Sequence, residues 1–389
     1  MENKLAKKEN KNLKTDKFYN SFNQWRGYFT MVGVEIDGSI GEGGGQVLRA
    51  SIAYAAVCGK ALKIFNIRTK RDNPGLRPQH LIAVKAVSAL CDGRVNGLEI
   101  GSREITFVPS EIKGGKFKFR IGTAGSTSLV LQALIPVALF ANEEVFITLE
   151  GGTNNAWAPQ IDYLQNIFLP LAERTGAKIE IEIKKRGHYP KGGGRITAKI
   201  SPVKSLKPLI LTEFGEVEKI EGLSHCVKLP QHVAERQAKA ALEELWQYYG
   251  NINIQLEWRE KETDPRLGPG SGIVLWAKTT KGAILSGDAL GAPKKPAEEV
   301  GKEAASNLLK ELKPKMPVDS HTGDQLIPLM ALANGVSKIK VSQLTLHTET
   351  CIKVSEIIMG AKFDVKGELN KPAEITCQGI GLENPLLED

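Results

Sequence analysis

The chain has 389 residues, of which 41% are hydrophobic and 25% charged, a composition typical of a globular protein with two domains or one large domain with an insert. No apolar run is long enough to span a bilayer, and the N-terminus lacks the apolar core of a signal peptide, so we expect a cytoplasmic protein without a membrane partner. The net charge of +8 favours polyanionic partners, and five scattered cysteines without a CxxC pair argue against structural zinc.

Residues 1–30 contain many lysines and few apolar side chains, and we predict a basic N-terminal extension that is disordered. An apolar strand over residues 32–36 leads through the glycine-rich segment 37–45 into a helix that begins near Gln46. Glycines let backbone N–H groups turn toward a ligand, and a helix N-terminus carries partial positive charge, so this loop suits phosphate. Glu42 in the loop indicates a cation beside the phosphate. The pattern matches neither GxGxxG nor the Walker motif, and a tight strand-to-helix turn is the alternative.

From residue 32 the order strand, helix, strand, helix and two strands recurs, and we predict three such β-α-β-α-β-β repeats. The expected helices cover residues 46–57, 78–91, 128–140, 159–174, 325–333 and 349–359. The expected strands cover residues 62–68, 98–100, 104–108, 145–149, 178–184, 195–200, 338–343, 363–369 and 374–378.

The repeats agree in register. Three helices carry a polar side chain ten residues before the Gly or Asn that ends them, namely Arg49, Gln132 and Gln325. His80 and His347 each precede a terminating glycine by thirteen residues. If equivalent helix starts pack around one axis, these polar residues converge on a common cleft.

Residues 204–312 interrupt the series between repeats two and three, and we predict a second, smaller α/β domain there. Its expected strands and helices cover residues 209–212, 217–220, 232–249, 252–259, 273–279 and 297–312. The large three-repeat domain then consists of residues 31–203 and 313–389. His225 and His232 have no metal-like neighbours in the sequence and are predicted to be surface or capping residues.

A group of basic and polar residues surrounds the glycine-rich loop in the first repeat. It consists of Arg49, Arg68, Lys70, Arg71 and Arg77 together with Gln79 and His80. Guanidinium groups beside such a loop form a site for phosphate oxygens, with a bidentate geometry that lysine lacks. A solvated basic loop is the alternative interpretation.

Three further segments are candidates for chemistry. The segment 321–325 opens a helix with free backbone amides, and Asp324 there is suited to a ribose hydroxyl or a water-mediated metal, or else is a plain N-cap. His347 stands where a β-rich run enters a helix, and a neutral imidazole can attack phosphorus, although a lone histidine is usually structural. The loop 151–159 is suited to a sugar or base, or is a well-capped turn.

Five segments resemble the RNA 3′-terminal phosphate cyclase family. They are residues 37–49, 68–80, 121–132 and 188–194 and the segment around His347. The resemblance implies an α/β (α+β) fold of three β-α-β-α-β-β repeats with a smaller α/β domain inserted before the third. It also implies an ATP-dependent reaction in which a histidine becomes adenylated, the adenylate moves to an RNA 3′-phosphate, and the 2′-hydroxyl closes a 2′,3′-cyclic phosphate.

The resemblance also assigns site residues. His347 takes the place of the adenylated histidine, and Glu42 matches a carboxylate that binds Mg or Mn. The implied ATP-binding residues are Gln132, His321, Thr322, Gly323, Asp324 and Gln325. The implied phosphate- and RNA-binding residues are Arg49, Arg68, Arg71, Gln79 and His80. His321 stands where the family commonly has an aromatic residue, and an imidazole can still stack on adenine.

Two other functions remain open at this point. The family includes catalytically silent members that act as RNA-binding scaffolds in ribosomal RNA processing, and those relatives lack the nucleophilic histidine that this chain retains at His347. A sugar-phosphate transferase built on similar repeats is the other alternative. The oligomeric state is not indicated by the sequence.

Overall fold

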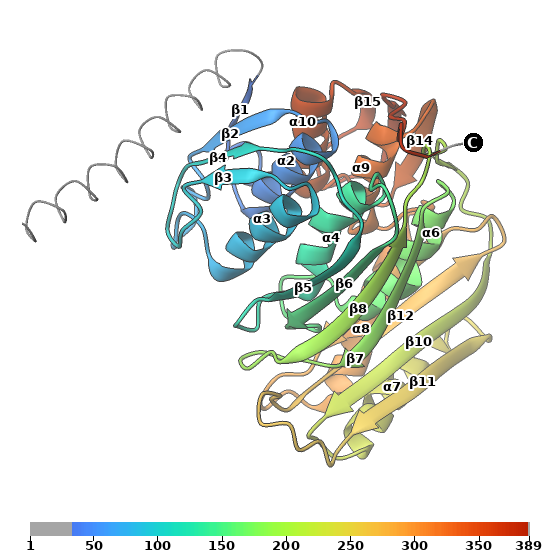
Figure 1. Cartoon of the computed structure of the whole chain (residues 1–389). Coiled ribbons are helices and arrows are strands. Elements are labelled where there is room, and N and C mark those ends of the chain that lie inside the picture. The colour runs from blue at the N-terminus through green and yellow to red at the C-terminus, as the bar shows by residue number, and fades with distance from the viewer. Residues whose placement is uncertain (1–32, 388–389) are drawn as a thin grey trace, which may run out of the picture.

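The computed structural model describes residues 33–387, and the basic extension predicted over residues 1–30 lies outside them. The α/β fold of three β-α-β-α-β-β repeats is confirmed (Figure 1). Repeat one consists of β1 (Gly33–Asp37), α2 (Gly45–Val57), β2 (Ala61–Phe65), α3 (Pro78–Leu90), β3 (Arg94–Asn96) and β4 (Ile105–Val108). Repeat two consists of β5 (Gly115–Arg120), α4 (Thr127–Ala138), β6 (Val145–Gly151), a helix in the three parts α5 (Ile161–Tyr163), η1 (Leu164–Phe168) and α6 (Leu169–Glu173), β7 (Lys178–Lys185) and β8 (Gly194–Ser201). Repeat three consists of β9 (Ile210–Leu211), α9 (Thr322–Leu332), β14 (Val336–Val341), α10 (Leu346–Met359), β15 (Lys362–Gly367) and β16 (Ala373–Gln378).

The three sheets have the same topology. Their strand orders are β1-β2-β4-β3, β5-β6-β8-β7 and β9-β14-β16-β15. In each sheet the first two strands pair in parallel and the other two pairings are antiparallel. This repeated pairing shows that β9 is the first strand of repeat three.

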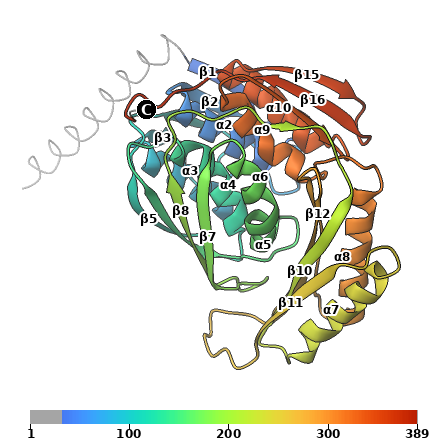
Figure 2. The same ribbon diagram turned by 90° about the vertical axis from the view of Figure 1, so that its right-hand side faces the viewer.

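The inserted domain has a sheet of its own. It consists of β10 (Val217–Val227), α7 (His232–Leu245), β11 (Ile252–Arg259), β12 (Gly270–Thr279), β13 (Ile284–Leu290) and α8 (Ala297–Leu312). The strand order is β11-β10-β12-β13, and α7 and α8 pack together on this sheet (Figure 2). Because β9 precedes this sheet and α9 follows it, the structure refines the predicted position of the insert to a point inside repeat three, after its first strand.

The helices of the repeats form the centre of the large domain. α2 contacts α3, α4 and α10, while α9 contacts α4 and α10. These helices are apolar on almost every side, as expected for helices buried between sheets. Their N-terminal ends therefore meet near one another, which brings the loops that precede α2, α4, α9 and α10 to one region of the molecule.

Some predicted elements differ from the structure. The strand expected over residues 98–100 is wrong: β3 lies earlier, and Gly97 and Gly101 adopt positive φ angles of 73° and 84° on either side of an exposed Ile100. The helix expected over residues 159–174 contains a π turn instead of continuous α-helix, and Pro170 just after it lacks the N–H that an α-helical bond requires.

Two strands, β5 and β13, are absent from the predicted elements. In β13 the pair Gly287-Asp288 resembles a turn in the sequence. The structure requires glycine at this position for another reason, because a Cβ on Gly287 would lie 2.2 Å from the backbone nitrogen of Leu308 in α8. None of the helices within residues 33–387 is long and apolar enough to cross a membrane.

Candidate active site

A cleft of about 1770 Å³ opens where the helix starts of the three repeats meet. The polar side chains predicted from the register of the repeats, Arg49, Gln132 and Gln325, all line it. Gln79, His321, Asp324 and His347 line it as well. The other predicted site residues, Glu42, Arg68, Arg71, His80, Thr322 and Gly323, lie outside its lining. The cleft is therefore the place where the predicted site residues are concentrated.

His347 lies in the first turn of α10, where its imidazole is 55% exposed. Thr345 caps this helix, because its Oγ1 accepts from the Thr348 backbone N–H over 3.1 Å. His347 Nε2 is 4.0 Å from Glu42 Oε2, and Nδ1 faces the side-chain oxygen of Gln46. The imidazole thus stands between the glycine-rich loop and the start of α2, accessible from the cleft.

The glycine-rich loop rests directly on the first turn of α10. Thr350 Oγ1 accepts from the Glu42 backbone N–H over 3.3 Å and donates to Leu346 O over 2.6 Å. Gly41 has a φ of 57°, and a Cβ there would lie 2.1 Å from Thr350 Oγ1. Only glycine permits this approach, which places the backbone of Glu42 against the helix turn that follows His347.

Arg49 faces the cleft, and no acidic side chain among the described residues pairs with its charge. Within residues 33–387 its guanidinium has no hydrogen bond and no ion pair, and burial lowers its pKa, with Glu42 opposing that effect. A half-buried cation that lacks a partner is unfavourable unless an anion binds it. This arrangement favours a phosphate-bearing ligand at the start of α2.

Arg68 and Arg71 hold the rim of the site. Arg68 Nη1 donates to Asn73 O over 2.7 Å and to Gly75 O over 3.0 Å, so it supports the loop before α3. Arg71 Nη2 pairs with Glu42 Oε2 over 2.5 Å while its side chain stays 46% exposed. Of the two, Arg71 is the one whose charge is available to a ligand that approaches Glu42.

Gln79 and His80 connect α3 to the neighbouring helices. Gln79 Oε1 accepts from the Ser126 backbone N–H over 2.8 Å, and Ser126 caps α4. His80 Nδ1 accepts from the Arg77 backbone N–H over 3.2 Å, so its hydrogen is on Nε2. Burial, aided by Arg49, lowers the pKa of His80 to about 3. His80 is therefore a neutral hydrogen-bond donor near the glycine-rich loop.

The start of α9 is capped by a residue that the sequence interpretation missed. Asp319 Oδ1 accepts from the backbone N–H of Thr322 over 2.7 Å and of His321 over 3.2 Å. Asp324 is thus not the cap: its Oδ2 accepts from Gln46 Nε2 over 2.7 Å, and burial raises its pKa, with His347 opposing that rise. The alternative of a plain N-cap at Asp324 is wrong.

Two amide groups in the cleft have an atom without a partner. Gln325 Nε2 donates to His321 O over 3.1 Å, while Gln325 Oε1 and Gln132 Nε2 bond to nothing within residues 33–387. Buried polar atoms are normally satisfied, so these two favour a ligand with both donors and acceptors, such as a nucleotide.

The described part of the chain holds no group of three or more His, Cys, Asp or Glu residues that could bind a metal ion. Glu42 is a single carboxylate, held by Arg71, at the mouth of the glycine-rich loop. Mg²⁺ is commonly bound by one or two carboxylates together with substrate phosphates and water. Glu42 therefore fits a divalent cation only in the company of phosphate oxygens from a bound nucleotide.

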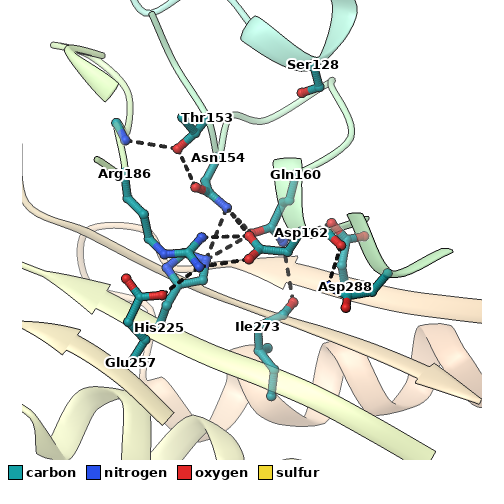
Figure 3. A network of polar contacts seen from close by, with 12 residues as sticks. Ser128, Thr153, Asn154, Gln160, Asp162, Arg186, His225, Glu257, Ile273 and Asp288 are labelled. Carbon is teal, nitrogen blue, oxygen red and sulfur yellow. Dashed lines mark hydrogen bonds and ion pairs between the residues drawn. The ribbon is translucent and has the colours of Figure 1, made fainter. Parts of the chain in front are cut away.

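A buried polar network joins repeat two to the inserted domain (Figure 3). It borders the cleft through Asn154 and Asp288, which line it. Arg186 makes two bonds to Asp162, of 2.7 and 2.8 Å, and a third of 2.8 Å to Glu257 on β11. Asn154 Nδ2 donates to Asp162 Oδ2 over 3.1 Å and lies 3.2 Å from His225 Nε2. The loop 151–159 thus contributes to this network as well as to the cleft.

His225 corrects a prediction, because it is fully buried on β10 and not a surface or capping residue. Its partners Asn154 and Gln160 come from repeat two, far away in the sequence, so no local pattern indicated its burial. His232 is exposed at the start of α7, as predicted.

Acid should destabilise this region through His225 and the adjacent buried His188, whose ring centroids are 5.4 Å apart. Burial, aided by Arg186, lowers the pKa of His188 to about 4 and that of His225 well below its usual value. Below about pH 6.5 these histidines therefore bind protons in the unfolded chain but stay neutral in the folded chain. We expect the unfolding free energy to fall by roughly 1.4 kcal/mol for each histidine and each unit by which the pH is lowered. For His188 the loss ends near pH 4. Urea unfolding between pH 7.5 and 4.5 measures how the unfolding free energy depends on pH. In His188→Phe this dependence should be weaker by the contribution of one histidine. An unchanged pH dependence in that variant would assign the acid sensitivity to other groups.

Residues 40–365 match the family model described as RNA 3′-terminal phosphate cyclase. Relatives named RNA 3′-terminal phosphate cyclase include one from Ignicoccus hospitalis, 52% identical over 89% of this chain and 99% of the relative. Another from Pyrococcus furiosus is 50% identical over 87% of this chain and 97% of the relative. A third from Methanopyrus kandleri is 47% identical over 90% of this chain and 99% of the relative. Among solved structures, that of the enolpyruvyl transferase NikO from Streptomyces tendae aligns with 90% of this chain and 49% of the NikO chain. The TM-score is 0.39 and the sequence identity 9%, a likeness too weak to inform the function.

Proposed function

Because the chain belongs to the RNA 3′-terminal phosphate cyclase family, we propose that it converts an RNA 3′-terminal phosphate into a 2′,3′-cyclic phosphodiester with ATP as co-substrate, through an adenylated His347. The observation that carries the proposal is the position of His347. Its imidazole is accessible from a cleft that also contains the uncompensated Arg49 and the unpartnered amide atoms of Gln132 and Gln325.

In the first step His347 Nε2 attacks the α-phosphorus of ATP. A nitrogen–phosphorus bond forms, the bond from phosphorus to the bridging oxygen breaks, and pyrophosphate leaves with the electron pair. Arg49 and the amides of the glycine-rich loop are suited to the charge that develops on the leaving group. Gln132, His321 and Gln325 line the part of the cleft that we assign to the nucleoside.

In the second step an oxygen of the RNA 3′-phosphate attacks the adenylate, and the nitrogen–phosphorus bond breaks to return a neutral His347. The RNA then ends in a pyrophosphate-linked adenylate. The neighbouring 2′-hydroxyl attacks the former terminal phosphate, AMP leaves, and the cyclic phosphodiester closes. Hydroxyl and phosphate are held on one ribose, so proximity contributes much of the acceleration in this last step.

Glu42 is the residue that would hold a divalent cation, with phosphate oxygens completing the coordination, and such a cation supplies charge neutralisation when bound. Arg71 already shares that carboxylate, and we assign both residues to the phosphate end of the cleft. The sequence interpretation of Mg or Mn at Glu42 therefore stays a prediction.

The direct test incubates the full chain with an RNA that ends in a 3′-phosphate, ATP and Mg²⁺. We expect an RNA end that resists phosphatase, together with one AMP and one pyrophosphate for each end closed. Omission of ATP should leave the 3′-phosphate open to phosphatase. RNA that binds the protein but keeps a phosphatase-sensitive end in the complete mixture would favour the scaffold function over the cyclase.

Arg71 provides a second test, because it lies at the rim and pairs with Glu42. We expect Arg71→Ala to weaken the use of 3′-phosphorylated RNA by about 10- to 100-fold, since one charge-assisted contact to phosphate is lost, while self-adenylation changes less. Radiolabel from α-labelled ATP separates the two steps. Arg94→Ala, at an exposed position on β3, is the matched control. Equal loss of both steps would place Arg71 at the ATP phosphates instead.

A further inference from the structure

We propose that Gln46 is a positioning residue that fixes the ring tautomer of His347, an inference that rests on the proposed function. Gln46 is the second residue of α2, and its side chain is buried where α2 packs against α10. Its amide nitrogen donates to Asp324 Oδ2 over 2.7 Å and to Cys351 Sγ over 2.9 Å. Its amide oxygen faces His347 Nδ1. The side chain thus connects a carboxylate on α9 to the imidazole on α10.

While Asp324 is ionised, the three groups allow one orientation of the Gln46 amide. An ionised carboxylate accepts hydrogen bonds and donates none, so the NH₂ group of Gln46 faces Asp324, as its 2.7 Å contact with Oδ2 shows. The amide oxygen then faces His347, and an amide oxygen also only accepts. His347 Nδ1 must therefore carry the ring hydrogen, and in a neutral imidazole the lone pair is left on Nε2.

This tautomer is the one that the first chemical step needs. Nε2 is the ring nitrogen nearer the glycine-rich loop, 4.0 Å from Glu42 Oε2. Without Gln46 that carboxylate would favour the opposite tautomer, because an Nε2–H could donate to it. In that form the nitrogen aimed at the phosphates has a hydrogen and no free electron pair. Gln46 therefore opposes Glu42, and the reactive fraction of His347 depends on it.

The test has a structural and a kinetic readout. Gln46→Met keeps the length of the side chain but removes both the acceptor and the donor. Nitrogen NMR of the full chain labelled at its six histidines, with the His347 signals assigned from their loss in His347→Ala, reports which ring nitrogen carries the hydrogen. We expect hydrogen on Nδ1 in the wild type and a mixture in Gln46→Met. Self-adenylation with ATP should fall by about 10- to 100-fold in that variant.

A conservative variant separates positioning from general loss of structure. Gln46→Glu restores an acceptor toward His347, and its second oxygen can share a proton with Asp324, since two carboxylates in contact do not both ionise. We expect it to keep hydrogen on Nδ1 and to react within about tenfold of the wild type. Gln343→Met is the matched control at a surface position, where the side chain bonds only to Asn370.

The outcomes distinguish this inference from the proposed function. A wild type that acquires no label from ATP contradicts the proposed function, and the NMR result still decides the tautomer. Hydrogen on Nε2 of His347 in the wild type, or a Gln46→Met protein with unchanged tautomer and rate, would overturn the role of Gln46. If Gln46→Met does not fold, the wild-type spectrum and Gln46→Glu decide between the same two outcomes.

Discussion

Replacing His347 by alanine is expected to abolish the covalent transfer of AMP from ATP to the protein. The imidazole is exposed, lines the cleft and lies 4.0 Å from Glu42 in the glycine-rich loop. His321 is a second exposed imidazole in the cleft lining, which we assign to the nucleoside. His188 also lines the cleft, but it is buried. Incubation with α-labelled ATP, followed by denaturation, measures the transfer. The label should be acid-labile, as a nitrogen–phosphorus bond requires, and absent from His347→Ala.

The matched control is His232→Ala, because His232 is exposed at the start of α7 in the inserted domain and does not itself line the cleft. It should acquire label at the wild-type rate. Label that persists in His347→Ala would remove this residue from the role of nucleophile. Loss of RNA binding together with loss of label in His347→Ala would point instead to a collapsed cleft, which thermal unfolding of the variant would reveal.

Local patterns in the sequence were sufficient for most of the fold. Helix and strand periodicity, with glycine at helix ends, placed α8 and β11 at their observed bounds. The agreement of Arg49, Gln132 and Gln325 in register predicted their convergence, and the structure brings all three to one cleft. Repeats make such inference effective, because each unit repeats the same local signals and errors in one are corrected by the others.

The missed features depend on contacts between distant segments. β13 contains a Gly-Asp pair that resembles a turn, and only the approach of α8 explains the glycine. β9 was assigned to the insert because no local signal shows that a two-residue strand pairs with β14. Asp319 was missed as the cap of α9 for a related reason: its carboxylate also accepts from Ser286 in the inserted domain, a partner far away in the sequence.

In the site, the residue types in the sequence indicated the candidate residues, but they did not predict which side chains are in contact. The register of the repeats predicted that the glycine-rich loop and His347 face a common cleft. It did not predict their direct contact, which runs through Thr350 on α10. Gln46 was read only as the start of a helix. Its signal, a polar side chain in the first turn of an otherwise apolar helix, is the same signal that singled out Arg49 three residues later.

The second large effect concerns stability, and it arises in the network of Figure 3. Asp162→Ala is expected to lower the unfolding free energy by roughly 3–5 kcal/mol, because it leaves the buried Arg186 without two of its three hydrogen bonds. Arg186 is 2% exposed and Asp162 is fully buried, so water cannot replace the lost carboxylate. Urea unfolding at pH 7.5 measures the change. Asp92→Ala, which breaks the exposed pair with Lys113, should change stability by less than about 1 kcal/mol.

A double variant tests whether the loss comes from a stranded charge or from lost attraction. Asp162→Leu combined with Arg186→Met removes both charges and fills the space with apolar atoms. If the penalty arises from a buried cation without a partner, the double variant should be more stable than Asp162→Ala by about 1–4 kcal/mol, since replacing both members of a buried pair is often tolerated. A double variant that is no more stable than Asp162→Ala would show that the attraction itself holds the inserted domain on repeat two, because Arg186 also reaches Glu257 across that boundary. In that case the wall of the cleft would depend on the ion pair for its shape, and self-adenylation should fall together with stability in both variants.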